Sequence, residues 1–63
     1  MHKEEDFLGL SKKSAQDLAD RKNLIFRLIR VDEKNMFSYP ADKRDDRVCI
    51  EIDKGKVTKV TFT

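Results

Sequence analysis

A long polar stretch between two short apolar segments constrains the fold of this chain more than any other feature. Residues 32–47 have too few periodically spaced apolar side chains for a helix, and too many polar ones for a buried core. Irregular connections of more than about 12 residues are uncommon in small domains, and most of them are functional loops or disordered segments. A chain of 63 residues that gives so much of its length to one loop is expected to act through it, by binding.

Length and cysteine content limit the class of protein. Sixty-three residues allow one domain with one thin core. The single cysteine, Cys49, excludes an intramolecular disulfide, and His2 is the only histidine, so neither a structural zinc site nor any cofactor is expected. The sequence has no signal-peptide pattern and no apolar run of membrane-spanning length, which predicts a soluble, cytoplasmic protein without a membrane partner.

The charge balance argues against a strong nucleic-acid binder. Fourteen Lys and Arg residues are nearly matched by 12 Asp and Glu residues, and the net charge is only +2. Nucleic-acid binders concentrate unpaired basic residues on one face, whereas interspersed charges are typical of a solvated surface. No nucleic-acid partner is expected. A weak nucleic-acid binder that uses Lys12, Lys13, Arg27 and Arg30 together with the basic loop residues is an alternative.

The remaining sequence predicts a helix, a strand and a hairpin, which together make an α+β domain. Three ranges rich in apolar and β-branched residues are expected to be strands, namely 24–31, 47–53 and 56–63. Gly55 can supply the positive φ of a tight turn, so the last two strands are expected to pair as an antiparallel hairpin. Residues 1–8 are expected to be a flexible N-terminal segment, and residues 9–63 a single domain.

A helix is predicted over residues 12–22. Ser11 is suited to cap it, because a serine hydroxyl can accept a hydrogen bond from an N–H group of the first turn. Ala15, Leu18 and Ala19 follow i, i+3, i+4 spacing and form a narrow apolar stripe. We expect this helix to cover one face of the sheet and to leave the other face, or an edge, to the loop.

The sequence lacks the residues of a catalytic site. A Ser-His-Asp or Cys-His set needs a well-placed histidine, but His2 stands at the extreme end of the chain. Gly9 and Gly55 are the only glycines, so there is no glycine-rich phosphate loop. Cys49 is expected to be a small, half-buried strand residue. We therefore expect that the protein is not an enzyme.

The loop contains features of a preorganised binding segment. Met36 and Phe37 are expected either to tuck under the loop or to remain free for a partner. Pro40 favours an extended conformation for Tyr39, so residues 39–42 are expected to be extended. The charged residues that follow are either a solvated run or an internal brace, in which Asp42 and Arg47 form a charge-assisted hydrogen bond as the loop curls back over its base.

The order and spacing of these residues resemble the potato inhibitor I family, in particular its short, disulfide-free bacterial and phage relatives. The resemblance spans residues 9–60, and the following segments carry it: Gly9-Leu10-Ser11, Ala15, Leu18-Ala19, Arg27 to Arg30, ADKRDDRVCIEID and GKVTKV. It implies one helix packed on a small mixed sheet. The first two long strands would be parallel, and a long exposed binding loop would join them.

Members of this family inhibit serine endopeptidases. The resemblance implies that a loop of about residues 38–45 enters a subtilisin-like or elastase- or chymotrypsin-like active site as a slowly cleaved substrate mimic. In the family, the residue before the scissile bond lies six positions ahead of the arginine of the Asp-Arg signature, which selects Ala41-Asp42 here. The implied reactive-loop residues are Tyr39, Pro40, Ala41, Asp42, Lys43 and Arg44, and the implied bracing residues are Asp42 and Arg47.

Two positions depart from the family pattern. Pro40 replaces the threonine that commonly precedes the specificity residue, and Cys49 stands where plant members have a second bracing arginine. An alternative function is therefore a non-inhibitory protein–protein interaction module of the same fold, for example a small accessory protein that blocks another factor. A monomer is expected rather than a dimer.

Overall fold

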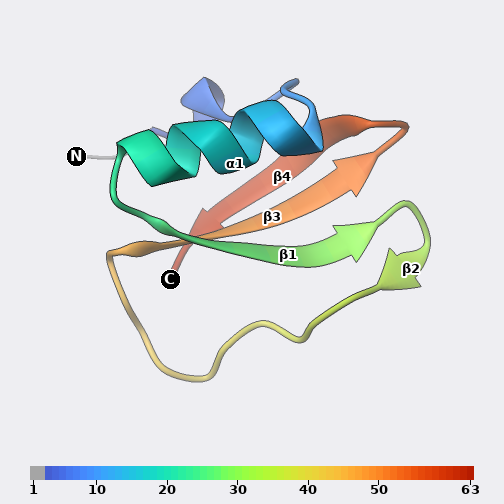
Figure 1. The fold of residues 1–63 in the computed structure, drawn as a ribbon. Helices are drawn as coiled ribbons and strands as arrows, with labels where there is room; N and C mark the ends of the chain where they lie inside the picture. The colour runs from blue at the N-terminus through green and yellow to red at the C-terminus, as the bar shows by residue number, and fades with distance from the viewer. Residues whose placement is uncertain (1–2) are drawn as a thin grey trace.

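The computed structural model describes residues 3–63 as an α+β domain with a helix on one face of a mixed four-stranded sheet (Figure 1). In chain order the elements are η1 (Glu4–Asp6, a 3₁₀ helix), α1 (Lys12–Arg21), β1 (Ile25–Val31), β2 (Lys34–Asn35), β3 (Arg47–Asp53) and β4 (Lys56–Phe62). The α+β class is confirmed. No helix within these residues has the length and apolar character needed to traverse a bilayer.

The strands lie in the order β2-β1-β3-β4. β1 pairs with β3 in parallel, from Ile25 opposite Arg47 onward, and the other two pairings are antiparallel. The parallel pairing confirms the expectation that the resemblance gave for the first two long strands. β2 lies inside the stretch predicted to be irregular, so that prediction was wrong for two residues. Asp32, with φ of 56°, turns the chain back so that β2 pairs with the end of β1.

The helix and the hairpin form where local signals place them. The Ser11 hydroxyl accepts a hydrogen bond from the Ser14 amide, which confirms the predicted cap of α1. Between β3 and β4, Lys54 and Gly55 both have positive φ, the conformation of a two-residue hairpin turn. Each of these elements therefore starts or turns at a residue whose local chemistry favours that conformation.

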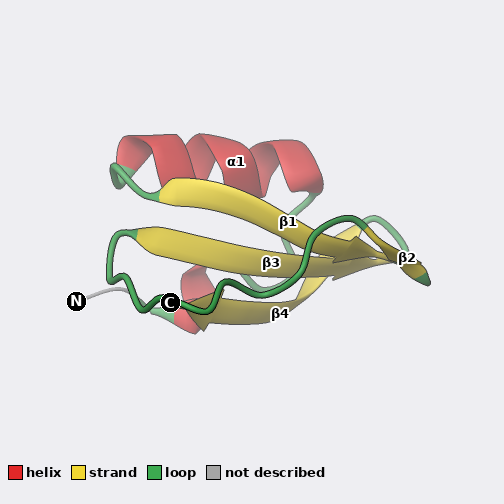
Figure 2. Cartoon of the chain, turned by 90° about the horizontal axis from the view of Figure 1, so that it is seen from below, coloured by secondary structure: helices red, strands yellow, loops and turns green. Residues whose placement is uncertain are grey.

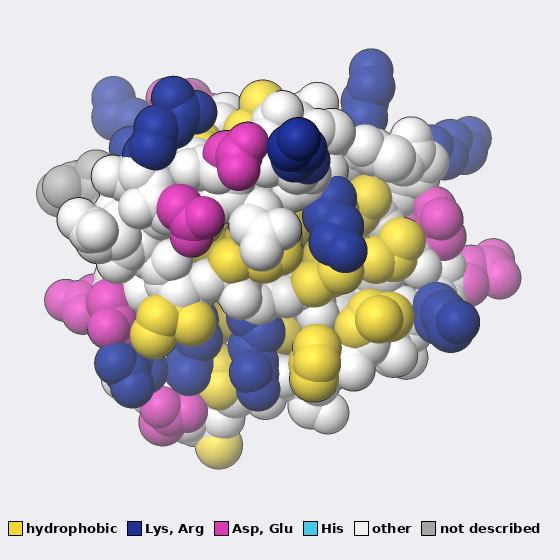
Figure 3. All heavy atoms as spheres, in the orientation of Figure 1, with side chains coloured by type: hydrophobic (Ala, Val, Ile, Leu, Met, Phe, Trp, Pro, Cys, Tyr) yellow, Lys and Arg dark blue, Asp and Glu magenta, His cyan; other side chains and the backbone are white. Residues whose placement is uncertain are grey.

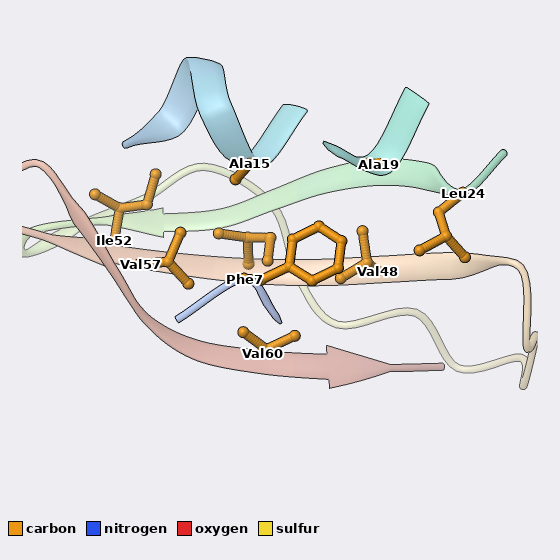
Figure 4. Close-up of a cluster of buried hydrophobic side chains, with 9 residues drawn as sticks. Phe7, Ala15, Ala19, Leu24, Val48, Ile52, Val57 and Val60 are labelled. Atoms are coloured by element: carbon orange, nitrogen blue, oxygen red, sulfur yellow. The ribbon is translucent and has the colours of Figure 1, made fainter. Parts of the chain in front are cut away.

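The core lies between α1 and the sheet (Figure 4). Its buried members come from every layer: Phe7, Ala15, Ala19, Leu24, Val48, Ile50, Ile52, Val57 and Val60. Ala15 and Ala19 are small enough to let the helix backbone approach the strands closely. Figure 4 shows the Phe7 ring at the centre of this cluster.

The N-terminal segment differs from the sequence expectation. Residues 1–8 were expected to be a flexible tail, but Glu4–Asp6 form η1, and Phe7 is fully buried and packs edge-on against Phe62, with 6.0 Å between ring centroids. The segment is polar up to residue 6, and this composition suggested a flexible tail. The burial of Phe7 depends on a partner, Phe62, that is distant in sequence. Met1 and His2, also part of that expectation, lie outside the described residues.

The central strand β3 is buried on both faces. Val48, Ile50 and Ile52 point into the core, while Cys49 points to the opposite face and is also fully buried. The expectation of a half-buried Cys49 was therefore wrong, because the loop passes over this face of the sheet (Figure 2). Burial raises the pKa of the Cys49 thiol.

Replacing Phe7 with alanine should destabilise the domain by about 3–5 kcal/mol, because it empties the centre of the core. The matched control is Leu8→Ala at the exposed neighbouring position, which should change stability by less than about 0.5 kcal/mol. Urea unfolding of both variants measures the effect. Equal unfolding midpoints for Phe7→Ala and the wild type would show that the N-terminal segment does not belong to the core.

Candidate functional site: the loop between the parallel strands

Residues 36–46 form a loop that crosses the sheet on the face opposite α1 (Figures 1 and 2). Because β1 and β3 are parallel, the chain must travel back along the sheet before β3 begins. A helix usually makes this return, but here an irregular segment does. The loop is therefore an exposed connection whose two ends are fixed by neighbouring strands.

Arg47 holds the C-terminal side of the loop. It is the first residue of β3 and is only 8% exposed. Its Nε donates a hydrogen bond of 2.7 Å to the Thr63 carbonyl, and its Nη2 donates to the Asp42 carbonyl at 3.1 Å and to Asp42 Oδ1 at 3.3 Å. The predicted contact between Asp42 and Arg47 is confirmed, and one guanidinium joins the loop to the end of the chain.

Tyr39 holds the N-terminal side of the loop. Its hydroxyl donates to the carboxylate of Glu51, which projects from β3 on the same face as Cys49. The other Glu51 oxygen accepts a hydrogen bond of 2.9 Å from Arg30 Nε. The two terminal nitrogens of Arg30 each donate a hydrogen bond of 2.9 Å to the Asp53 carboxylate. The Lys59 ammonium lies 3.7 Å from Glu51 and 5.5 Å from the Tyr39 ring centroid. The carboxylate thus links the loop to β1, β3 and β4.

The electrostatics of this second anchor favour its hydrogen-bonded form. The Tyr39 hydroxyl and the Arg30 guanidinium lower the pKa of Glu51. Partial burial and the Glu51 carboxylate raise the pKa of Tyr39 to about 12. At neutral pH the phenol is therefore protonated and donates to an ionised carboxylate.

The six predicted reactive-loop residues include both anchors, Tyr39 and Asp42. Two of the others lie between the anchors, and Lys43 and Arg44 follow them. Pro40 is half-buried, whereas Ala41, Asp42 and Lys43 are exposed. Arg44 makes two hydrogen bonds of 2.8 Å to Asp46, and this pairing lowers the pKa of the Asp46 carboxyl to about 2. The loop is thus pinned at Tyr39 and at Asp42, with the Ala41-Asp42 peptide bond exposed.

The loop backbone contains no left-handed turn. Within residues 3–63, positive φ occurs outside glycine only at Asn23, Asp32 and Lys54, none of which belongs to the loop. The backbone of residues 38–45 therefore has negative φ throughout. Negative φ is common to helical and extended backbone, and the chain bends at Ala41 and Asp42. The expectation that residues 39–42 are extended was therefore wrong for these two residues, because the loop turns where Arg47 binds Asp42.

Met36 and Phe37 border a hollow of about 670 Å³ between the start of the loop, β1 and β2. The two side chains are 46% and 56% exposed, so they do not tuck under the loop. The Arg27 guanidinium lies 5.2 Å from the centroid of the Phe37 ring. The hollow is lined by apolar as well as polar residues, among them Ile29, Arg30 and Glu51.

The bond between Tyr39 and Glu51 was not predicted from the sequence. The alternation of β3 placed Cys49 and Glu51 on the face away from the core, and this was the available signal. The pairing itself depends on the parallel register and on the path of the loop, which no local pattern specifies.

Among residues 3–63, no three His, Cys, Asp or Glu side chains are grouped as metal ligands.

Comparison with known proteins finds no matching family model, no matching curated protein and no matching solved structure.

Replacing Glu51 with glutamine should reduce stability by about 1–2 kcal/mol near neutral pH, because it weakens the bonds from Tyr39 and Arg30. Since folding lowers the Glu51 pKa, its contribution is present above the ordinary value of 4.5 and is lost as the pH falls through the folded value. The difference between variant and wild type should therefore shrink as the pH is lowered from about 7 towards 2.

Urea unfolding over this pH range measures the effect, with Glu33→Gln in the exposed turn after β1 as the matched control. Glu33→Gln should leave stability unchanged at each pH. A Glu51→Gln variant that is as stable as the wild type near pH 7 would contradict the anchoring role.

Proposed function

We propose that this protein is a potato inhibitor I-like inhibitor of serine endopeptidases. Residues 38–45 would enter a subtilisin-like or elastase- or chymotrypsin-like active site as a slowly cleaved substrate mimic. One observation carries the proposal: an exposed Ala41-Asp42 bond lies between two points at which the loop is bound to the sheet. The fold and the loop position that the family resemblance implies are compatible with the α+β topology described above.

Anchoring on both sides of one bond is what an inhibitory loop requires. A loop already held in its bound conformation loses little conformational entropy when an enzyme binds it. If the enzyme cleaves Ala41-Asp42, Tyr39 still holds one new end to Glu51, and Asp42 still holds the other to Arg47. The amine then stays beside the acyl-enzyme, so that resynthesis of the bond competes with release.

The residue at the proposed scissile bond sets the expected target class. Ala41 is small and uncharged, which suits a shallow apolar pocket and not the deep acidic pocket that accepts lysine or arginine. Lys43 and Arg44 would lie on the leaving-group side of the bond. Elastase-like and subtilisin-like enzymes are therefore the expected targets.

The second candidate is a non-inhibitory protein–protein interaction module of the same fold. The half-exposed Met36 and Phe37 favour it, because they lie outside the proposed reactive segment and offer apolar surface to a partner. Pro40 and Cys49, which depart from the family pattern, also favour it. Such a module would bind its partner through the loop without inhibiting a protease.

The deciding experiment is inhibition of subtilisin, pancreatic elastase, chymotrypsin and trypsin by the purified protein, with mass analysis of any cleavage. Potent inhibition with slow cleavage at Ala41-Asp42 supports the proposal. Rapid digestion within the loop, or binding to a panel enzyme without inhibition, would contradict it.

Replacing Arg47 with lysine should weaken inhibition by about tenfold or more and should speed cleavage of Ala41-Asp42. Lysine keeps the charge, but it lacks the planar guanidinium whose nitrogens donate hydrogen bonds to Thr63 and to Asp42 at the same time. Inhibition constants and cleavage rates measure the effect. Arg21→Lys, at an exposed position of α1, is the control and should behave as the wild type. Unchanged potency and cleavage for Arg47→Lys would refute the bracing role.

Replacing Ala41 with leucine should shift preference from elastase-like towards chymotrypsin-like enzymes. A larger apolar side chain fills a deeper specificity pocket. One added methylene group in such a pocket changes the preference of an enzyme between two ligands by about 10-fold or more. The ratio of inhibition constants for chymotrypsin and elastase measures the shift. Ser38→Leu, three residues earlier in the loop, is the comparison variant, and its ratio should change less. An unchanged ratio for Ala41→Leu would place the scissile bond elsewhere.

A further inference from the structure

The sheet carries three arginines, Arg27, Arg30 and Arg47, and their surroundings differ. Arg30 is paired with two carboxylates, and Arg47 is paired with Asp42. Within residues 3–63, by contrast, Arg27 forms no ion pair with any carboxylate. Its Nε is buried and has no hydrogen-bond partner in the described part of the chain. A partly buried guanidinium without a counter-charge is unfavourable for an isolated domain.

Arg27 lies against an aromatic side chain of the loop. Its guanidinium lies 5.2 Å from the Phe37 ring centroid, in cation–π geometry, and Phe37 is itself more than half exposed. Met36, the residue before Phe37 in the loop, is also exposed. Figure 3 shows dark blue and yellow side chains side by side over the region that β1 and the loop occupy in Figure 1. The surface thus combines one unpaired positive charge with apolar contact area.

Arg27 lies on the face of the sheet that the loop crosses. In the parallel pair, Arg27 lies opposite Cys49, and Ile25 lies opposite Arg47. Arg27 is therefore two residues further along β1 than the level of Arg47. Two residues of a strand span about 7 Å. A protein partner of ordinary size covers about 800 Å² of its ligand, which is enough area for one partner to contact both Ala41 and Arg27.

We infer that Arg27 and Phe37 form a second contact surface, which receives an Asp or Glu side chain of the partner that binds the loop. The inference deepens the proposed function and rests on it for the identity of the partner. A carboxylate fits because it can pair with the guanidinium fork while apolar groups beside it contact Phe37 and Met36. A polyanion such as nucleic acid fits less well, because Asp42, Asp45 and Asp46 lie exposed or half-exposed in the same loop.

The first test needs no variant and no protease. Acetyl-Leu-Glu-Leu-amide and acetyl-Leu-Gln-Leu-amide are titrated separately into the ¹⁵N-labelled wild-type protein, and the Nε–H signals of the arginines are followed by NMR. The glutamate peptide should shift the Arg27 signal and the Phe37 ring signals. The glutamine peptide should bind more weakly, by a factor of about three or more. Equal responses to both peptides, or shifts centred on Arg30 or Arg47, would overturn the inference.

The second test uses any enzyme of the panel that the wild type inhibits. Arg27→Gln should raise the inhibition constant about threefold or more and flatten its salt dependence, whereas Arg21→Gln on α1 should change neither. Thermal unfolding of both variants checks that they are folded. If Arg27→Gln matches Arg21→Gln, the inference fails while the proposed function stands. If no enzyme is inhibited, the proposed function fails, and the peptide titration alone decides whether Arg27 binds carboxylates.

Discussion

The contact between Arg47 and the loop is the interaction on which this structure depends. Parallel pairing of β1 and β3 obliges the chain to return along the sheet. Here a loop makes the return, and it has few backbone hydrogen bonds of its own. The nearly buried Arg47 guanidinium stands where β3 begins and binds both the loop, at Asp42, and the end of the chain, at Thr63. One side chain therefore fixes the three segments that meet at this end of the sheet.

The two faces of β3 have different surroundings. Val48, Ile50 and Ile52 pack beneath α1 and form the core with Phe7. The residues between them face the loop, where Glu51 anchors Tyr39. The loop face is stabilised by burial of Cys49 and by the hydrogen bonds that Glu51 accepts from Tyr39 and Arg30. This arrangement lets so small a chain present a long, ordered loop.

Local signals in the sequence predicted the helix, the hairpin and most of the loop, because Ser11, Gly55 and strand alternation act over a few residues. Long-range features escaped prediction. Phe7 is a single aromatic residue after a polar run, and its burial depends on partners at the far end of the chain. The bond between Tyr39 and Glu51, and the exposure of Met36 and Phe37, depend on how the loop lies over the sheet. Side-chain periodicity carries no information about that path.

The central claim is that anchors on both sides hold the loop in one conformation before any partner binds. Backbone ¹⁵N relaxation of the free protein tests this most directly, by comparing residues 38–46 with β3. Anchoring on both sides predicts order parameters of about 0.85 for the loop, as for the strand. Values below about 0.6 between Tyr39 and Asp42 would show a flexible loop and would contradict the account.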